Sequence, residues 1–339
     1  MKRWISILVI VMMLAALVAG CGGQNNSADS SGTAGDNGEV KKLKVALLLP
    51  GPINDMGWNA SAYEGLKQAE EKFNVEIAYQ ENVQQSDMEG VFRGYAEQGY
   101  DVIIGHGFQF GDAAKKVAAE FPNSKFIVTS SNISQEPNLA SVNIDNEQQG
   151  FLMGVVAGLM TKSNIVGSIG GQEIPPIKGS LAGFEQGVKY VNPNATILST
   201  MTGSFDDVAK AKETALAMIS QGADVIMANA NQAGLGAIEA AKIKGVYAIG
   251  SNQDQNDIAP DTVVVSGIKS VPVLITFVVQ KIQNNDFEAK FYNLGFNEGA
   301  VYLSPYHGFE DKIPQEVKDK IKAITEDLAA GKIEVKKIS

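Results

Sequence analysis

Cysteine, histidine and tryptophan are scarce in this chain, whose 339 residues include one cysteine, two histidines and two tryptophans. A single cysteine excludes an internal disulfide. Neither His106 nor His307 belongs to an H-E-x-x-H motif, and no G-x-S-x-G motif, cysteine pair or ligand cluster with metal-site spacing occurs. We therefore expect no metal centre and no enzyme activity. His106, which glycines flank in "GHGFQFG", is interpreted as a structural residue.

The glycines do not form a cofactor-binding pattern either. Gly105, Gly107 and Gly111 do not fit G-x-G-x-x-G, and neither "GSIGG" nor "AGLGA" completes that fingerprint. Dinucleotide binding is discounted, and no other cofactor is expected. A nucleoside-cleaving enzyme would need a base or a metal site that the chain does not offer.

Basic residues are also in deficit, with 28 lysines and arginines against 38 acidic residues and a net charge of −10. Without Lys2 and Arg3, which belong to the N-terminal segment, the charge is −12. An acidic body without a basic patch is a poor partner for nucleic acid or for an anionic membrane surface.

The first 21 residues resemble a lipoprotein signal. A basic start at Lys2 and Arg3 precedes an apolar run at 5–18 and small residues before Cys21, which is how a secretory signal is built. The apolar run is shorter than the roughly 20 residues of a membrane-spanning helix. Since "LVAGC" resembles a lipobox, we predict a signal peptide at 1–20 and lipidation at Cys21, in preference to a buried cysteine.

The segment 21–41 is rich in glycine, serine and asparagine and poor in apolar residues. Such a composition buries too little surface to offset the entropy of ordering, which predicts a flexible tether. The remaining chain of roughly 300 residues is long enough for two lobes.

Short runs rich in valine and isoleucine alternate with helical patterns along this remainder. The runs are apolar throughout, as in strands of a parallel sheet that helices cover on both faces. One series occupies 44–50, 75–79, 101–107, 125–131 and 140–145, and a second occupies 164–171, 195–201, 224–230 and 246–251. Two such series predict an α/β fold of two doubly wound parallel-sheet lobes.

A further apolar run at 262–269 and two late helical patterns must be shared between the lobes. We assign 42–146 with 252–286 to the N-terminal lobe, and 147–251 with 287–339 to the C-terminal lobe. The chain would then cross between lobes near Asp145, Asn252 and Asp286, which predicts a hinge of three segments.

Ligands of open parallel sheets bind beyond the carboxyl ends of the strands. The residues that follow the predicted strands are mainly aromatic, amide and carboxylate groups, with one amine. The candidate ligand-binding residues are Asp55, Trp58, Asn59, Phe108, Asp145, Phe205, Asn229, Asn252, Asp254 and Lys269.

Several of these residues have simpler interpretations, which stay open. Trp58 and Phe205 can cap the core, although both sit in polar turns and two aromatics from opposite lobes can clamp a flat ring. Asp55 can be a helix N-cap, and Asn59 can order its own turn. Lys269 ends an apolar strand, and a buried amine needs a partner such as Asp254 or a ligand hydroxyl.

Motifs along the whole body resemble the basic membrane protein family of bacterial substrate-binding lipoproteins, which includes purine nucleoside receptors of ABC transporters. They include "NDMGWNASAYEGL", "GHGFQFGDA", "IVGSIGGQEIPP", "GSFDD", "GADVIMANANQAGLGAIEAAK", "IGSNQDQ" and "VSGIK". The resemblance implies a type I periplasmic-binding-protein fold. It also implies a monomeric receptor that captures a purine and delivers it to an ABC permease, held to the outer face of the cell membrane only by its lipid.

Carried over by motif, Trp58 and Phe205 would sandwich the purine ring, and Asn59 would read its edge. Lys269 and the segment with Asn252 and Asp254 would lie near the sugar. Tryptophan replaces the phenylalanine of the usual D-x-x-F-N turn, and Asn252 stands where many relatives have aspartate. A nucleoside and a free base such as adenine therefore both remain possible ligands.

The sequence leaves other binding functions open. The type I fold serves receptors for sugars and autoinducers, but their sites surround the ring with several charged groups, and the candidate residues include no arginine. A sensor that reports ligand occupancy to a membrane kinase is a further alternative.

Overall fold

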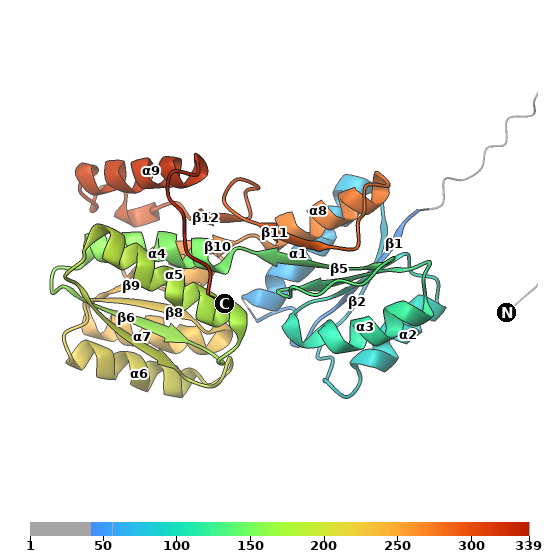
Figure 1. Ribbon diagram of the computed structural model, residues 1–339. Coiled ribbons are helices and arrows are strands. Elements are labelled where there is room, and N and C mark those ends of the chain that lie inside the picture. Colours follow the sequence, from blue (N-terminus) through green and yellow to red (C-terminus); the bar gives the residue numbers. More distant parts are fainter. Residues whose placement is uncertain (1–41, 56, 339) are drawn as a thin grey trace, which may run out of the picture. The chain divides into compact units, whose positions relative to one another are not determined.

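A computed structural model describes residues 42–55 and 57–338 (Figure 1). The predicted signal peptide, the lipidation site at Cys21 and the predicted tether at 21–41 lie outside these residues. The described residues form two lobes, each built on a six-stranded sheet.

The first sheet has the strand order β11-β5-β4-β3-β1-β2, and all of its pairs are parallel. Its lobe contains β1 (Lys44–Leu48), α1 (Trp58–Phe73), β2 (Glu76–Gln80), α2 (Met88–Glu97), β3 (Val102–Gly105), a 3-10 turn at Phe108–Phe110, α3 (Gly111–Glu120), β4 (Lys125–Thr129), β5 (Leu139–Ile144), α8 (Val271–Gln283) and β11 (Phe291–Leu294).

The second sheet has the order β12-β10-β9-β8-β6-β7, in which only the β10–β12 pair is antiparallel. Its lobe contains α4 (Asn146–Met160), β6 (Ile165–Gly170), α5 (Pro175–Val191), β7 (Thr196–Met201), α6 (Val208–Ser220), β8 (Val225–Asn229), a 3-10 turn at Asn231–Ala233, α7 (Gly234–Lys244), β9 (Tyr247–Asn252), a 3-10 turn at Asn256–Ile258, β10 (Val263–Lys269), β12 (Val301–Leu303), a 3-10 turn at His307–Phe309 and α9 (Gln315–Ala329).

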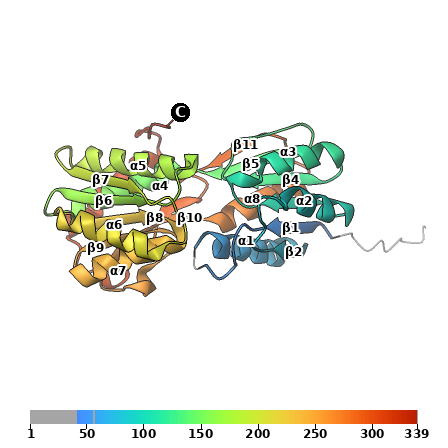
Figure 2. The same ribbon diagram turned by 90° about the horizontal axis from the view of Figure 1, so that it is seen from below.

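Helices cover both faces of each sheet, which explains why the central strands are apolar throughout (Figure 2). In the first lobe, α1 and α8 pack on one face, and α2 and α3 pack on the other. In the second lobe, α4 and α5 pack opposite α6 and α7. The predicted pair of doubly wound parallel sheets is therefore confirmed.

The chain passes between the lobes at three places. Asp145 joins β5 to α4, Ser270 joins β10 to α8, and a loop joins β11 to β12. These crossings lie side by side, because the Asp145 N–H donates to the Leu294 carbonyl at 2.8 Å and the Ser270 N–H donates to the Ala300 carbonyl at 2.8 Å. The crossing near Asp145 is where the sequence predicts it.

The predicted positions of the other two crossings, near Asn252 and Asp286, are wrong. After Asn252 the chain stays in the second lobe, because β10 pairs with β9. The segment 252–286 is thus divided between the lobes, and β11 at 291–294 belongs to the first sheet rather than to the C-terminal lobe. An apolar strand such as β10 suits a central position in either sheet, so its composition does not reveal its partner. Two short strands, β11 and β12, were not predicted.

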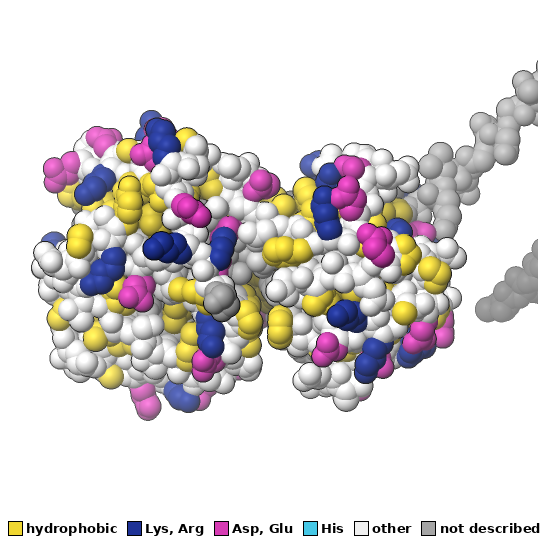
Figure 3. Space-filling view, viewed as in Figure 1, with side chains coloured by type: hydrophobic (Ala, Val, Ile, Leu, Met, Phe, Trp, Pro, Cys, Tyr) yellow, Lys and Arg dark blue, Asp and Glu magenta, His cyan; other side chains and the backbone are white. Residues whose placement is uncertain are grey.

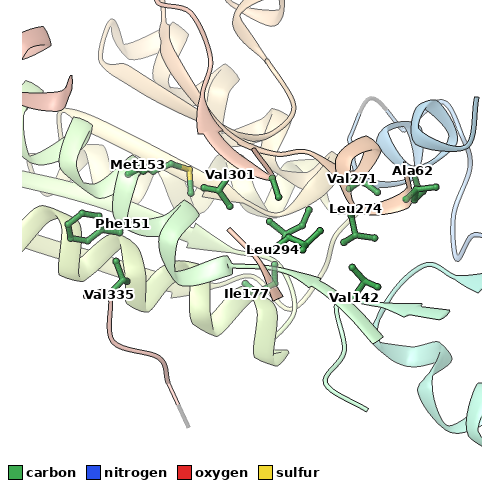
Figure 4. Close-up of a cluster of buried hydrophobic side chains, with 14 of the residues drawn as sticks. Ala62, Val142, Phe151, Met153, Ile177, Val271, Leu274, Leu294, Val301 and Val335 are labelled. Carbon is green, nitrogen blue, oxygen red and sulfur yellow. The ribbon is translucent and has the colours of Figure 1, made fainter. Parts of the chain in front are cut away.

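One large apolar cluster runs through both lobes (Figure 4). It includes Val142 and Leu274 of the first lobe and Phe151, Met153 and Ile177 of the second. Burial of the apolar surface of these side chains is the main stabilising contribution to such a fold, at about 25 cal/mol per Å².

The surface is polar and mixed in charge. Figure 3 shows basic and acidic side chains interspersed on one face of both lobes, without a broad basic patch on that face. Among the described residues, no helix combines the length and apolar character needed to cross a membrane.

Candidate ligand-binding site

A cavity of about 190 Å³ lies between turns of the two lobes. Its walls follow the carboxyl ends of β1, β3 and β4 in the first lobe, and of β6, β7, β8, β9 and β10 in the second. The strand order of each sheet reverses direction at β1/β3 and at β6/β8, and such switch points leave a crevice between the following turns. The topology therefore explains where the cavity forms.

The turn before α1 is organised by the carboxylate of Asp55, which is buried. Its Oδ1 accepts from the N–H groups of Gly57 at 2.9 Å and Ala60 at 3.0 Å, and its Oδ2 accepts from the N–H of Asn59 at 2.9 Å. A helix leaves its first N–H groups without intrahelical partners, and an anion satisfies them well. Asp55 does not line the cavity. It satisfies the first N–H groups of α1 as an N-cap would, although Gly57 occupies the N-cap position itself.

Asp55 also fixes the orientation of the Asn59 amide. The Asn59 Nδ2 donates to Asp55 Oδ2 at 2.7 Å, so the amide nitrogen points to the carboxylate. Asn59 lines the cavity, and its buried Oδ1 has no hydrogen-bond partner within the described part of the chain. An unpaired buried acceptor costs about 1–3 kcal/mol, which a ligand N–H or O–H donor would recover.

Trp58 lies on the imidazole of His106. The two ring centroids are 4.3 Å apart and the ring planes are inclined by 22°. His106 Nε2 is 3.2 Å from the Trp58 carbonyl oxygen, and His106 Nδ1 is 3.0 Å from Thr129 Oγ1. Because a carbonyl only accepts, Nε2 carries the proton and Nδ1 accepts from the hydroxyl.

His106 is neutral in this environment. It is completely buried, and burial lowers the pKa of its imidazole to about 3. His106 does not line the cavity, and its contacts are with Trp58 and Thr129.

Phe205 enters the cavity from the second lobe, in the turn between β7 and α6. Its ring lies against Gly171, where an added Cβ would stand 2.4 Å from Phe205 Cδ1. Only glycine at position 171 leaves room for this ring position. Trp58 and Phe205 thus line one cavity from opposite lobes, as the clamp hypothesis requires.

Lys269 brings a buried cation to the cavity wall. Its Nζ donates to Asn146 Oδ1 at 3.1 Å and lies 5.2 Å from the centroid of the Trp58 ring. Burial lowers the pKa of the Lys269 ammonium to about 8. The expected partner Asp254 is elsewhere, since its carboxylate pairs with His307 Nε2 at 2.6 Å on the surface of the second lobe.

Amide groups form the base of the second-lobe wall. Asn229 Nδ2 donates to Ser180 Oγ at 2.9 Å, and Asn252 Nδ2 is 3.5 Å from Asn229 Oδ1. The buried Oδ1 of Asn252 has no partner among the described residues. Asn252 and Asn59 thus both line this cavity, and each has a buried Oδ1 without a partner among the described residues.

Seven of the ten candidate residues line the cavity: Trp58, Asn59, Phe108, Phe205, Asn229, Asn252 and Lys269. Phe108 is at the rim, with 44% of its surface exposed. Asp55, Asp145 and Asp254 do not line it. Asp145 instead caps α4 by accepting from the Gln148 N–H at 3.0 Å, and it forms an ion pair with Lys337.

The remaining lining residues were not among these ten, although the strand-end rule also indicates Ile174, Asp206 and Asn231. They are Pro50, Gly51, Gly107, Gln109, Ser130, Ile174, Pro176, Ile177, Asp206 and Asn231. Most of them also follow strands, so the strand-end rule can find them, but their side chains do not by themselves indicate a ligand. Asp206 is the only acid among the described lining residues, and it is exposed.

A family model described as Bmp, ABC transporter substrate-binding protein PnrA-like, matches residues 42–338. Basic membrane protein A2 of Borrelia garinii subsp. bavariensis is 33% identical over 268 residues, which are 76% of this chain and 78% of that protein. The ABC transporter nucleoside-binding protein BmpA of Lactococcus lactis subsp. cremoris is 31% identical, and the alignment covers 98% of this chain and 99% of that protein.

Solved structures share the architecture. The crystal structure of an ABC transporter system solute-binding protein from Aeropyrum pernix K1 superimposes with a TM-score of 0.77 at 23% sequence identity. The match covers 88% of this chain and 94% of that chain. The expected type I periplasmic-binding-protein fold is therefore confirmed.

Proposed function

Because the chain belongs to the PnrA-like family of ABC transporter substrate-binding proteins, we propose that it captures a purine nucleoside or purine base and delivers it to a membrane permease. The family consists of solute-binding proteins rather than enzymes, and such proteins act on the extracytoplasmic side. The observation that carries the purine proposal is the cavity with Trp58 on one lobe and Phe205 on the other.

The cavity chemistry suits a flat heterocycle with donors on its edge. Two aromatic faces can stack on the two faces of a purine, and stacking contributes about 1–3 kcal/mol per base in nucleic-acid binders. Asn59 Oδ1 would accept from an edge donor, such as the amino group of adenine or the ring N–H of hypoxanthine. The nucleoside-binding name of the Lactococcus relative supports the same ligand class.

The opposite wall would hold the remainder of the ligand. The Lys269 ammonium donates, and the Asn252 amide can accept or donate, so both can bind sugar hydroxyls or ring nitrogens. A nucleoside would bring sugar hydroxyls to these two residues, whereas a free base would bring only ring atoms. A ligand that touches both lobes stabilises the closed form by its differential affinity for that form.

We propose also that Cys21 carries a lipid that holds the protein on the membrane beside its permease, with 21–41 as a tether. Replacement of Cys21 by serine should release the protein from membranes into the soluble fraction. Retention of the Cys21→Ser protein on membranes would contradict the anchor.

The test of the ligand is calorimetric titration of residues 42–339, stripped of ligand, with adenosine, guanosine, inosine, adenine, guanine and ribose. Tight binding of purine nucleosides or bases would support the proposal and separate the two subclasses. Binding of ribose alone would favour a sugar receptor, and an absence of heat from the whole panel would overturn the purine assignment.

A further inference from the structure

Asn231 of the second lobe makes two side-chain hydrogen bonds to the turn that carries Asp55, Trp58 and Asn59. Its Oδ1 accepts from the Trp58 N–H at 3.1 Å, and its Nδ2 donates to Asp55 Oδ2 at 3.3 Å. Asn231 follows β8 of the second lobe, whereas Trp58 and Asp55 belong to the first. We call this pair of hydrogen bonds the Asn231 latch.

We propose that the Asn231 latch stabilises the closed arrangement of the lobes and positions the Trp58–Asn59 turn for the ligand. This inference rests on the proposed function for the identity of the ligand. Asn231 is then a positioning residue, which holds the turn through its hydrogen bonds to Asp55 and Trp58.

An asparagine side chain is suited to both partners at once. The Trp58 N–H is the first of α1 and has no intrahelical acceptor, so it needs an acceptor from outside the helix. The Asp55 carboxylate needs donors. A primary amide offers an acceptor and a donor on two adjacent atoms, whereas an ionised carboxylate offers acceptors only.

The backbone on both sides permits the close approach. An added Cβ at Gly57 would stand 2.3 Å from Asn231 Oδ1, so only glycine at this position leaves room for the latch. Asn231 itself has φ 49°, in the left-handed region that asparagine tolerates better than most other residues. Residues at both ends of the contact thus have the conformational properties that the latch needs.

The latch has a consequence that does not depend on which purine is bound. When the lobes separate, Trp58 and Asp55 must exchange Asn231 for water. If only the closed form binds tightly, the apparent affinity is proportional to the fraction of protein that is closed. A weaker latch therefore lowers the affinity for every ligand by the same factor. The ratio of affinities between two ligands stays constant.

The experiment measures lobe closure and binding in the same variants. Fluorescence energy transfer between dyes at Gln98→Cys and Gln221→Cys, both exposed and on different lobes, reports closure in a Cys21→Ser background. Asn231→Ala should lower the closed-to-open ratio of the ligand-free protein about tenfold, the loss expected for two modest hydrogen bonds. Its dissociation constants for adenosine and inosine should rise by equal factors. Asn194→Ala, in an exposed loop of the second lobe, is the matched control and should change neither.

Asn231→Asp gives a readout that a purely structural role would not produce. The new carboxyl keeps the acceptor for Trp58 but faces Asp55, so closure should be weaker than in Asn231→Ala at neutral pH. Two adjacent carboxyls hold one proton with a raised pKa, and that proton restores the missing donor as the pH falls. Closure of this variant should recover in acid relative to the wild type.

Other titrating groups near this turn are His106, Lys269 and the rim carboxylate of Asp206, and the wild-type pH profile records their contribution. Gly57→Ala is an independent variant that blocks the latch without changing a polar group, and it should reproduce Asn231→Ala. Unchanged closure in both variants, or affinity losses that differ between adenosine and inosine, would overturn the latch. Because closure is measured without ligand, this outcome is distinct from a failure of purines to bind.

Discussion

The indole of Trp58 stacks on the imidazole of His106, and the same imidazole donates a hydrogen bond to the Trp58 carbonyl. One buried neutral residue thus supports both the side chain and the backbone of the residue proposed to stack on the ligand. This support reduces the freedom that Trp58 would otherwise lose on binding, and preorganisation of this kind increases affinity.

Removal of the Trp58 indole should weaken the binding of all purines alike. Trp58→Ala is expected to cost about 1–3 kcal/mol, or roughly 5- to 150-fold in Kd, because stacking is insensitive to the substituents of the ring. Trp58→Phe is the control, since it keeps an aromatic face and should retain most of the affinity. Calorimetry with adenosine, inosine and guanosine measures the effect, and unchanged affinity in Trp58→Ala would rule out the sandwich.

Removal of the Asn59 amide should instead narrow the difference between purines. The protein should prefer adenosine to purine riboside, which lacks the amino group, because Asn59 Oδ1 is an acceptor without a partner. In Asn59→Ala this preference should shrink by about fivefold to tenfold, the worth of one buried hydrogen bond.

Asp55→Asn tests how the Asn59 acceptor is oriented. The substitution keeps the volume of the side chain but lets the Asn59 amide rotate and present its nitrogen. The same preference for adenosine should therefore diminish in Asp55→Asn. A full preference in both Asn59→Ala and Asp55→Asn would contradict edge recognition by Asn59.

The pKa of His106 predicts a specific loss of stability in acid. The folded pKa, about 3, is below the ordinary value of 6.5, so between these pH values the unfolded chain binds a proton that the folded chain does not. Linkage then makes the free energy of unfolding fall by about 1.4 kcal/mol per pH unit as the pH decreases through this window. Above pH 6.5 the imidazole is neutral in both the folded and the unfolded chain, so His106 causes no loss of stability there.

This slope can be measured by urea unfolding at several pH values. His106→Gln should lack the His106 contribution, so its stability should fall less steeply in acid than that of the wild type, whatever its stability at neutral pH. His307→Gln keeps His106 and serves as the comparison variant. Equal slopes in the wild type and His106→Gln would show that the folded protein binds the proton.

Lys269 predicts a loss of affinity in base. Its pKa of about 8 means that the side chain is an ammonium below this pH and a neutral amine above it. A hydrogen bond from a charged donor exceeds a neutral one by about 1 kcal/mol, so adenosine should bind roughly fivefold more weakly above this pH. Lys269→Met, which fills similar space without a charge, should bind more weakly at neutral pH and show no such decline. A decline of equal size in Lys269→Met would assign the effect to another group.

Secondary structure and much of the site are predictable from local patterns. Apolar runs indicated the ten strands from β1 to β10, and the residues just beyond them supplied seven residues of the cavity wall. The rule succeeds because the carboxyl ends of parallel strands meet at one edge of a sheet. Trp58, Asn59 and Phe205 were found in this way.

Three carboxylates show where local patterns are insufficient. Asp55, Asp145 and Asp254 also follow strands, but each is engaged by its own helix N-terminus or by a basic residue from a distant segment. Position after a strand does not distinguish a side chain that faces the crevice from one that turns back to the backbone. A carboxylate can find hydrogen-bond donors in either orientation. The donors that the fold places around it therefore decide which orientation it adopts.

The sequence by itself determined the alternation of strands and helices and the residue types at the strand ends, because periodicity and turn chemistry are local properties. Only the tertiary structure decided which sheet β10 and β11 join, that His106 lies under Trp58, and that Asn231 reaches the Asp55 turn from the other lobe. These contacts join residues separated by up to 176 positions. Their partners are selected by the packing of the whole chain, since an apolar strand, an imidazole or an amide is compatible with many neighbours until the fold brings one of them within reach.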